Sequence, residues 1–282
     1  MAELLKGAEV AGGMKAELSA KVSALRDKGV VPRLGILRVG EKPGDLSYEK
    51  GATKRCESLG LDSKVFSFSE STSNEAFMEE FRRINDDGSI HGVLVLRPLP
   101  LHMDEERVKA MIDPSKDVDG MSPVNVAKVF AGADSGFAPC TARAVMEIIR
   151  HYNVRLKGMR ATVVGRSMVA GRPLAMLLLD RHATVTVCHT RTADLAGECR
   201  KADVLITAAG APKMIKASYV GAGATVIDVG INVDEHGRLC GDVDFEGAEP
   251  VAGKITPVPG GVGAVTSSVL AMHTIIACEA IT

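Results

Sequence analysis

Residues 161–173 read ATVVGRSMVAGRP, and this stretch decides the fold. An apolar run up to Val164 predicts a buried strand, Gly165 begins a turn, and a helix is expected from Gly171. Strand, glycine-containing turn and helix is the Rossmann arrangement, in which glycine permits close approach and the helix N-terminus offers free N–H groups to phosphate. The G-x-G-x-x-G fingerprint is absent, so a βα turn without a ligand is the alternative.

Strands and helices alternate along the rest of the chain in the same way. Short apolar strands are expected at 34–39, 65–68, 92–96, 161–165, 183–187, 204–207 and 225–229. Helices are expected between them and at both ends, at 14–28, 47–59, 73–86, 104–112, 142–152, 171–181 and 264–279. This alternation predicts parallel βαβ units. We therefore expect an α/β protein of two lobes that meet near residues 140–150.

The composition predicts a packed globular protein and does not suggest one that binds nucleic acid or a membrane surface. Hydrophobic residues make up 46% of the 282 residues and charged residues 24%, and the formal net charge is -1. The 6 cysteines are scattered without a C-x-x-C pair, which predicts reduced thiols and no metal site. No secretory signal and no run of about 20 apolar residues was found, so a cytoplasmic location without a membrane span is expected.

The residues after strand 183–187 bear on the cofactor. They read CHTRT, with no carboxylate before Asp194, whereas an NAD site commonly places Asp or Glu there. Arg191 and Arg166 could instead pair with a 2′-phosphate, which favours NADP. The alternative is that Arg191 is a solvated loop charge.

Blocks of sequence in both halves carry a family resemblance. The second half contains, in order, GRSMVAGRP (165–173), ATVTVCHTRT (183–192), DVGIN (228–232) and PVPGGVGAVT (257–266). The first half contains RVGEKPGDLSY (38–48), KDVDG (116–120) and PCTA (139–142). Over nearly its whole length the chain resembles the methylenetetrahydrofolate dehydrogenase/cyclohydrolase family.

The resemblance implies a fold and an activity. Such enzymes oxidise 5,10-methylenetetrahydrofolate by hydride transfer to NADP, and many then hydrolyse the methenyl product to 10-formyltetrahydrofolate. It implies an N-terminal folate-binding domain over 1–140 that the C-terminal helix, 266–282, rejoins. It also implies a Rossmann NADP-binding domain over 141–265, tetrahydrofolate derivatives as substrates, and a homodimer.

The resemblance also implies roles for particular residues. Catalytic and substrate-binding roles fall on Tyr48, which would stack on the aminobenzoyl ring, and on Asp119, which would bind the pterin. Gly260 and Gly261 would lie beside the folate. The cofactor would be held by Gly165, Arg166, Ser167, Thr190 and Arg191, with Ile231 at the nicotinamide end. Taken alone, Asp119 is better explained as a turn residue of the D-V-D-G sequence, and the alternative for Tyr48 is a half-buried helical aromatic.

Two residues depart from the family where its cyclohydrolase step is performed. The family has Y-x-x-x-K on one helix face, but Tyr48 is followed four residues later by Ala52. Lys50 and Lys54 are each displaced by about 200° around the helix from Ala52 and should face away from it. The family's L-V-Q-L-P-L-P becomes LVLRPLP, which puts Leu96 at the glutamine position and introduces Arg97.

The chemistry predicts which activity survives these changes. Hydride transfer needs alignment of the donor carbon with the nicotinamide and no side-chain base. Hydrolysis needs a water to be activated and a proton to be transferred, and in the family a lysine and a glutamine serve these needs. Ala52 and Leu96 cannot do so. We therefore expect a dehydrogenase with weak or absent cyclohydrolase activity.

Two rival interpretations stay open. The protein could be fully bifunctional if Lys50, Lys54 or Arg97 replaced the lysine after a local rearrangement. It could instead be a non-catalytic nucleotide-binding module, although such a module has no need of Tyr48, Asp119 and the PGGVG block. Metal catalysis and a serine-hydrolase site are disfavoured, because no ligand cluster accompanies the cysteines and G-x-S-x-G is absent.

Overall fold

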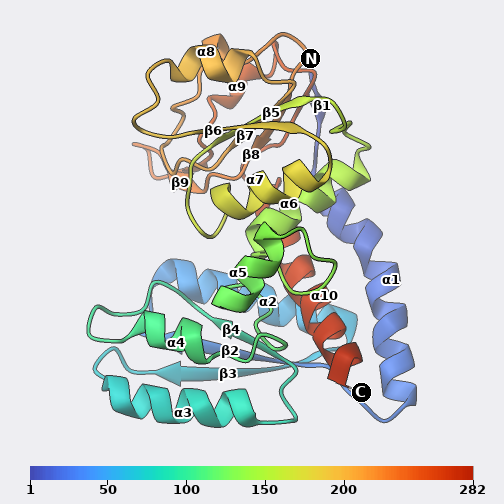
Figure 1. The fold of residues 1–282 in the computed structure, drawn as a ribbon, viewed down its shortest axis with the longest axis vertical. Coiled ribbons are helices and arrows are strands. Elements are labelled where there is room, and N and C mark those ends of the chain that lie inside the picture. Colours follow the sequence, from blue (N-terminus) through green and yellow to red (C-terminus); the bar gives the residue numbers. More distant parts are fainter. Residues whose placement is uncertain (282) are drawn as a thin grey trace. The chain divides into compact units, whose positions relative to one another are not determined.

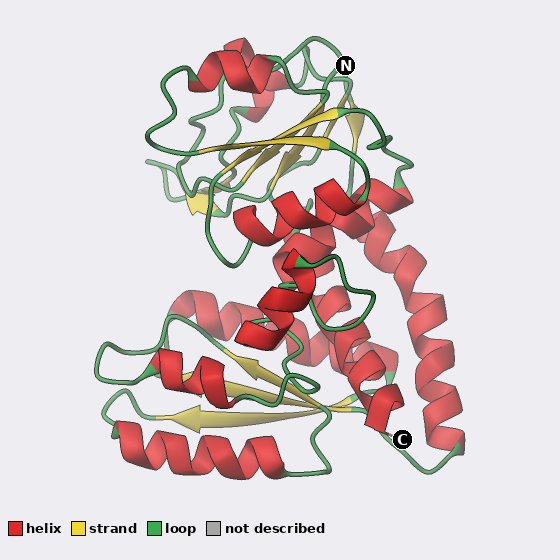
Figure 2. Cartoon of the chain, in the orientation of Figure 1, coloured by secondary structure: helices red, strands yellow, loops and turns green. Residues whose placement is uncertain are grey.

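The computed structural model describes residues 1–281 and divides them into two compact units (Figures 1 and 2). Residues 13–140 and 267–281 form what we call the three-stranded unit, and residues 1–12 and 141–266 form the six-stranded unit. Each has a parallel sheet with helices, so the predicted α/β architecture is confirmed.

The three-stranded unit is built on a parallel sheet in the order β3-β2-β4. Its strands are β2 (Arg33–Val39), β3 (Asp62–Phe68) and β4 (Gly92–Val95). Its helices are α2 (Pro43–Leu59), α3 (Asn74–Asp86), α4 (Glu105–Met111) and α5 (Pro123–Phe130), with most of α1 (Gly7–Asp27) and α10 (Gly263–Ile281). The central strand β2 buries six of its seven residues, as its apolar sequence requires.

An aromatic cluster fills the core under α3. Ser73 caps this helix by accepting a hydrogen bond from the Ala76 N–H, at 3.2 Å. Phe77 and Phe81, one turn apart, are fully buried, and Phe77 meets Phe68 of β3 edge-on at 5.1 Å between centroids. The helix is therefore held by its apolar face.

The six-stranded unit contains a parallel sheet in the order β1-β11-β8-β7-β5-β6. The strands are β1 (Glu3–Leu4), β5 (Arg160–Val164), β6 (Thr184–Cys188), β7 (Val204–Thr207), β8 (Thr225–Asp228) and β11 (Lys254–Ile255). A small antiparallel pair, β9 (Asn232–Val233) and β10 (Leu239–Cys240), follows β8. The helical elements are α6 (Cys140–His151), α7 (Gly171–Asp180), α8 (Leu195–Arg200), the 3₁₀ turn η1 (Ala217–Tyr219) and α9 (Phe245–Ala248).

The N-terminal segment corrects the expected domain division. Residues 1–12 were expected in the folate-binding domain 1–140, but they belong to the six-stranded unit. The physical reason is strand pairing, because β1 adds to β11 and the Leu5 N–H donates to the Ile255 carbonyl at 2.8 Å. Leu5 is fully buried as a result.

Helix α10 is long and apolar enough to cross a membrane by length and composition alone. Within the structure, 56% of its most apolar window is buried, and Val269, Leu270 and Ile275 have no exposed surface. Polar His273 and Thr274 are buried on the same helix. This burial is typical of the core helix of a folded protein.

Candidate active site

Helix α2 places Tyr48 and Ala52 on its buried face. Pro43 stands at the first turn, and the helix runs unbroken to Gly60, whose φ of 82° closes it in the left-handed conformation. Tyr48 is half-buried and Ala52, one turn later, is 1% exposed. The face then continues through other buried side chains, Cys56 and Leu59. None of these residues is a cation.

The two neighbouring lysines lie elsewhere on the helix. Lys50 and Lys54 are both exposed, as helical geometry predicts for residues displaced by about 200° from Ala52. The local break in the helix that would bring either lysine to the Tyr48 face is absent from α2 as described. Leu96, at the end of the neighbouring strand, is buried and apolar.

The loop that carries Asp119 is fixed by Asp117. The fully buried Asp117 carboxylate accepts hydrogen bonds from the N–H groups of Met121 and Ser122, at 2.9 and 2.8 Å. Gly120, with φ 61°, completes the turn, and a Cβ there would lie 2.4 Å from the Phe137 carbonyl oxygen. The D-V-D-G sequence is therefore a turn, and this turn presents Asp119.

Both oxygens of Asp119 have partners. Oδ1 accepts from the Cys140 N–H at 3.1 Å, and Oδ2 accepts from Nη2 of Arg97 at 3.4 Å. Burial raises the pKa of Asp119, while the charge of Arg97 acts to lower it. Burial also raises the pKa of Tyr48 well above its ordinary value, and the nearby Cys140 and Asp119 add to this shift. Tyr48 is thus a neutral phenol close to a carboxylate.

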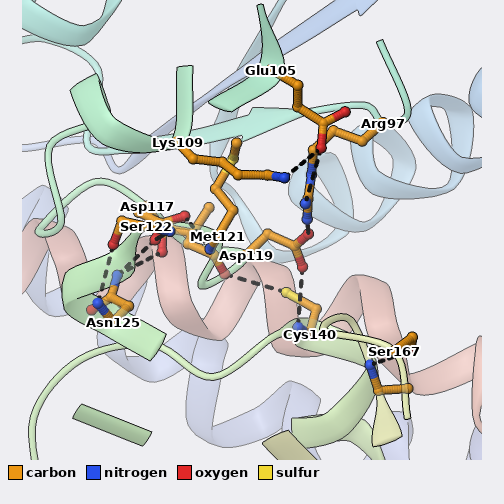
Figure 3. A network of polar contacts seen from close by, with 12 residues as sticks. Arg97, Glu105, Lys109, Asp117, Asp119, Met121, Ser122, Asn125, Cys140 and Ser167 are labelled. Carbon is orange, nitrogen blue, oxygen red and sulfur yellow. Dashed lines mark hydrogen bonds and ion pairs between the residues drawn. The ribbon is translucent and has the colours of Figure 1, made fainter. Parts of the chain in front are cut away.

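Arg97 belongs to a chain of alternating charges (Figure 3). Its side chain is 17% exposed, and its guanidinium lies between the carboxylates of Asp119 and Glu105, the latter at 3.9 Å. Glu105 in turn pairs with Lys109 at 2.8 Å and accepts from the Leu99 N–H at 3.2 Å. Arg97 is therefore a member of an ion-pair network and not a solvated surface charge.

In the six-stranded unit, the turn after β5 has the shape expected of a phosphate loop. Gly165 has φ 120°, and a Cβ there would lie 2.2 Å from the Ala208 carbonyl oxygen. A Cβ on Gly171 would lie 2.1 Å from the Gly165 carbonyl oxygen. Arg166 and Ser167 are exposed in this turn, and no side chain caps the start of α7 at Ala170. The Arg172 N–H donates to the Ser167 carbonyl at 3.0 Å and Pro173 has no N–H, so the feature that suits a phosphate here is the glycine turn itself.

The turn after β6 carries Thr190 and Arg191, both exposed. It is held by the Thr192 hydroxyl, which accepts from the His189 N–H at 2.9 Å, and by His189 Nδ1, which accepts from the Arg191 N–H at 3.1 Å. Strands β5 and β6 are parallel neighbours, so their carboxyl ends, and the turns with Arg166 and Arg191, lie at one edge of the sheet.

Ile231, Gly260 and Gly261 also lie in the six-stranded unit. Ile231 follows β8 and is 68% exposed. Its Cδ1 lies 3.4 Å from the ideal Cβ position of Gly263, so the DVGIN and PGGVG blocks are neighbours. Gly260 has φ 105°, and a Cβ on Gly261 would lie 2.5 Å from the Pro257 carbonyl oxygen. The glycines are required by this tight turn.

The aspartates that shape the Ile231 loop were missed in the sequence. Buried Asp228 accepts from the N–H groups of Gly230, Asp242 and Val243, at 2.9, 3.0 and 2.8 Å. Burial raises the pKa of Asp228 to about 6, although these hydrogen bonds act to lower it. The DVGIN block that contains Asp228 was the available signal, but the resemblance assigned no role to Asp228.

Metal ligands are not gathered anywhere in residues 1–281: no group of three His, Cys, Asp or Glu side chains there could hold a metal ion. The six cysteines are buried. The arrangement offers instead a carboxylate close to a phenol in one unit, and in the other a tight glycine turn between a strand and a helix.

The chain matches known proteins over nearly its whole length. A model of the tetrahydrofolate dehydrogenase/cyclohydrolase catalytic domain matches residues 5–119, and one of the NAD(P)-binding domain of the same proteins matches residues 139–282. The bifunctional protein FolD of Clostridioides difficile is 51% identical over 98% of this chain and 96% of its own length. That of Carboxydothermus hydrogenoformans is also 51% identical, over 99% and 98%.

Solved structures agree with the sequence matches. The bifunctional FolD enzyme of Campylobacter jejuni superposes with a TM-score of 0.96 at 39% identity, covering 99% of each chain. FolD of Trypanosoma brucei, solved with NADP cofactor and inhibitor, gives 0.94 at 36% identity over 99% of this chain and 98% of its own. The predicted nicotinamide dinucleotide cofactor is confirmed by the domain match. The chain belongs to the tetrahydrofolate dehydrogenase/cyclohydrolase family.

Proposed function

We propose that this protein is an NADP-dependent 5,10-methylenetetrahydrofolate dehydrogenase whose methenyltetrahydrofolate cyclohydrolase activity is weak or absent. The observation that carries the second part is the unbroken helix α2, in which Ala52 is 1% exposed on the Tyr48 face while Lys50 and Lys54 are exposed. Without a basic side chain on that face, the hydrolytic step lacks its proton-transfer group.

Family membership and the retained folate-side residues support the dehydrogenase. Tyr48 offers an aromatic ring for stacking, and Asp119 offers a carboxylate to the N–H edge of a pterin. Bound NADP would supply the hydride acceptor. What the chain contributes is the alignment of the two ligands, and neither Ala52 nor Leu96 is needed for that.

The dinucleotide side supports NADP as the cofactor. At Gly165 and Gly171 a Cβ would meet protein backbone at 2.2 and 2.1 Å, so this tight turn between strand and helix, the kind that binds phosphate in dinucleotide sites, requires glycine at both positions. Arg166 and Arg191 are exposed at one sheet edge, where their guanidinium groups suit a 2′-phosphate. The Trypanosoma brucei relative was solved with NADP.

Arg97 is the remaining candidate for a substitute cation in a fully bifunctional enzyme, because it touches Asp119. A guanidinium stays protonated throughout the working pH range, so it cannot alternate as base and acid for the attacking water. The pairing therefore does not restore the lost lysine. A homodimer and a cytoplasmic location stay predictions from sequence.

The test is to mix the purified protein with 5,10-methylenetetrahydrofolate and NADP and to follow reduced cofactor and methenyltetrahydrofolate separately. A mixture without enzyme gives the spontaneous hydrolysis rate. We expect both products to accumulate and the methenyl species to decay at the control rate. Much faster decay would contradict the proposed loss of cyclohydrolase activity, and no cofactor reduction would contradict the dehydrogenase itself.

A further inference from the structure

Arg97 is a charged residue at a position where the family pattern has leucine. It lies two residues after the end of strand β4 and is largely buried, with its side chain 17% exposed. A long cation is not kept in such a place for solubility, because removing it from water is costly unless its partners are well placed. Its partners therefore point to its role.

Those partners form a fixed frame around the Asp119 carboxylate. Arg97 donates to Oδ2 of Asp119 at 3.4 Å and lies 3.9 Å from Glu105. Glu105 is itself anchored by Lys109 and by the backbone N–H of Leu99. The guanidinium is thereby held from one side while it meets Asp119 on the other, as Figure 3 shows.

We propose that Arg97 is a substrate-positioning residue that holds the Asp119 carboxylate as an oriented anion for the pterin ring of the folate. The inference rests on the proposed function and adds to it a residue specific to this chain. A carboxylate has about four acceptor positions, and Arg97 and the Cys140 N–H use two. The others can accept the adjacent N–H donors of a pterin.

The electrostatics of the site explain why a cation is needed. The groups that face Asp119 are Arg97 after β4, Asp117 in its own loop, Cys140 from α6 and the Tyr48 phenol from α2. Only Arg97 among these is positive. Burial raises the pKa of Asp119, so without Arg97 the carboxyl would hold its proton to a still higher pH. A protonated Asp119 is a poorer acceptor for the pterin.

The test compares Arg97→Leu, which removes the charge, with Arg97→Lys, which keeps it. We expect Arg97→Leu to raise KM for 5,10-methylenetetrahydrofolate by roughly 10- to 100-fold, as for the loss of a hydrogen bond to a charged group. KM for NADP and kcat should change little, because the lost interaction acts on folate binding. The acid limb of kcat/KM for folate should move to higher pH, and Arg97→Lys should restore part of both effects.

Arg83→Leu is the matched control, since Arg83 pairs with Glu80 on the exposed side of α3 in the same unit. It should leave both KM values and the acid limb unchanged. If Arg97→Leu does not fold, as thermal melting would reveal, Arg97→Gln replaces it in the comparison with Arg97→Lys.

Three outcomes distinguish a failure of this inference from a failure of the proposed function on which it rests. A wild-type protein that does not reduce NADP with this folate overturns the proposed function. An active wild type, with folded charge-removing variants that keep its KM for folate and its acid limb, overturns the role of Arg97. Equal losses for folate and NADP would also overturn it, since they indicate general structural damage.

Discussion

If the cyclohydrolase activity is weak or absent as proposed, replacing Ala52 with lysine and Leu96 with glutamine is expected to raise it. Ala52 lies one helical turn after Tyr48 on the buried face of α2, so a lysine there projects from the face that carries the phenol. Burial would lower the pKa of the new amine toward the assay pH, where proton transfer is most effective.

The size of the gain follows from the chemistry and is limited by packing. A positioned general acid–base group contributes about 10²- to 10⁴-fold, and a lysine without tuned surroundings should reach the lower end, about 10²-fold. Ala52 is 1% exposed and Leu96 6%, so the larger side chain must displace packed neighbours. This overpacking should lower the free energy of unfolding by roughly 1–3 kcal/mol.

The assay follows the decay of added methenyltetrahydrofolate with each variant and without enzyme, and urea denaturation measures the stability cost. The matched control is Ala52→Met with Leu96→Gln, because methionine fills similar space without an amine. The control should lose similar stability and gain no hydrolysis. If the lysine variant folds, keeps dehydrogenase activity and hydrolyses no faster than the methionine control, the argument from Ala52 is refuted.

Three further predictions concern the six-stranded unit and the cysteines. Gly165→Ala should raise KM for NADP at least tenfold, because its Cβ would meet the Ala208 carbonyl oxygen at 2.2 Å. Gly158→Ala is the control, because Gly158 has a φ of 78° but nothing lies near its Cβ position, so alanine there adds backbone strain without a clash. Arg191→Ala should narrow the preference for NADP over NAD by about 10- to 100-fold in kcat/KM, if the guanidinium binds the 2′-phosphate; an unchanged ratio argues for a solvated loop charge. Burial raises the pKa values of Cys56 and Cys199 to about 12, so native protein should react slowly with a thiol reagent at pH 8 and faster as pH rises, with all 6 cysteines reacting in urea.

Local patterns were sufficient where the structure depends on nearest neighbours. The turn at Gly165 was predictable because an apolar strand, a glycine and a helix start follow one another in the chain. The burial of Ala52 and the exposure of Lys50 were predictable from the helical repeat of about 100° per residue. In both cases a short stretch contains all the geometry that the prediction uses.

Elements that depend on distant partners were not predictable. Strand β1 has only two residues, and it is a strand because β11, far away in the sequence, supplies its hydrogen bonds. No helix was expected where α5 forms, although Ser122 at its cap and Pro123 at its first turn are a start signal. The pairing of Arg97 with Asp119 joins residues 22 positions apart through the fold alone.

The changes at positions 52 and 97 act together on the charge that the reaction produces. Hydride removal from the neutral methylene bridge leaves a positive charge on the methenyl product. If the folate lies against Tyr48 and Asp119 as proposed, the neutral Ala52 removes a repulsion that a lysine ammonium would exert on this charge. Arg97 adds a cation, but Asp119 and Glu105 pair with it and oppose its field. Under the proposed function, the site therefore tolerates the charged product of the first step, while it lacks the lysine that would carry out the second.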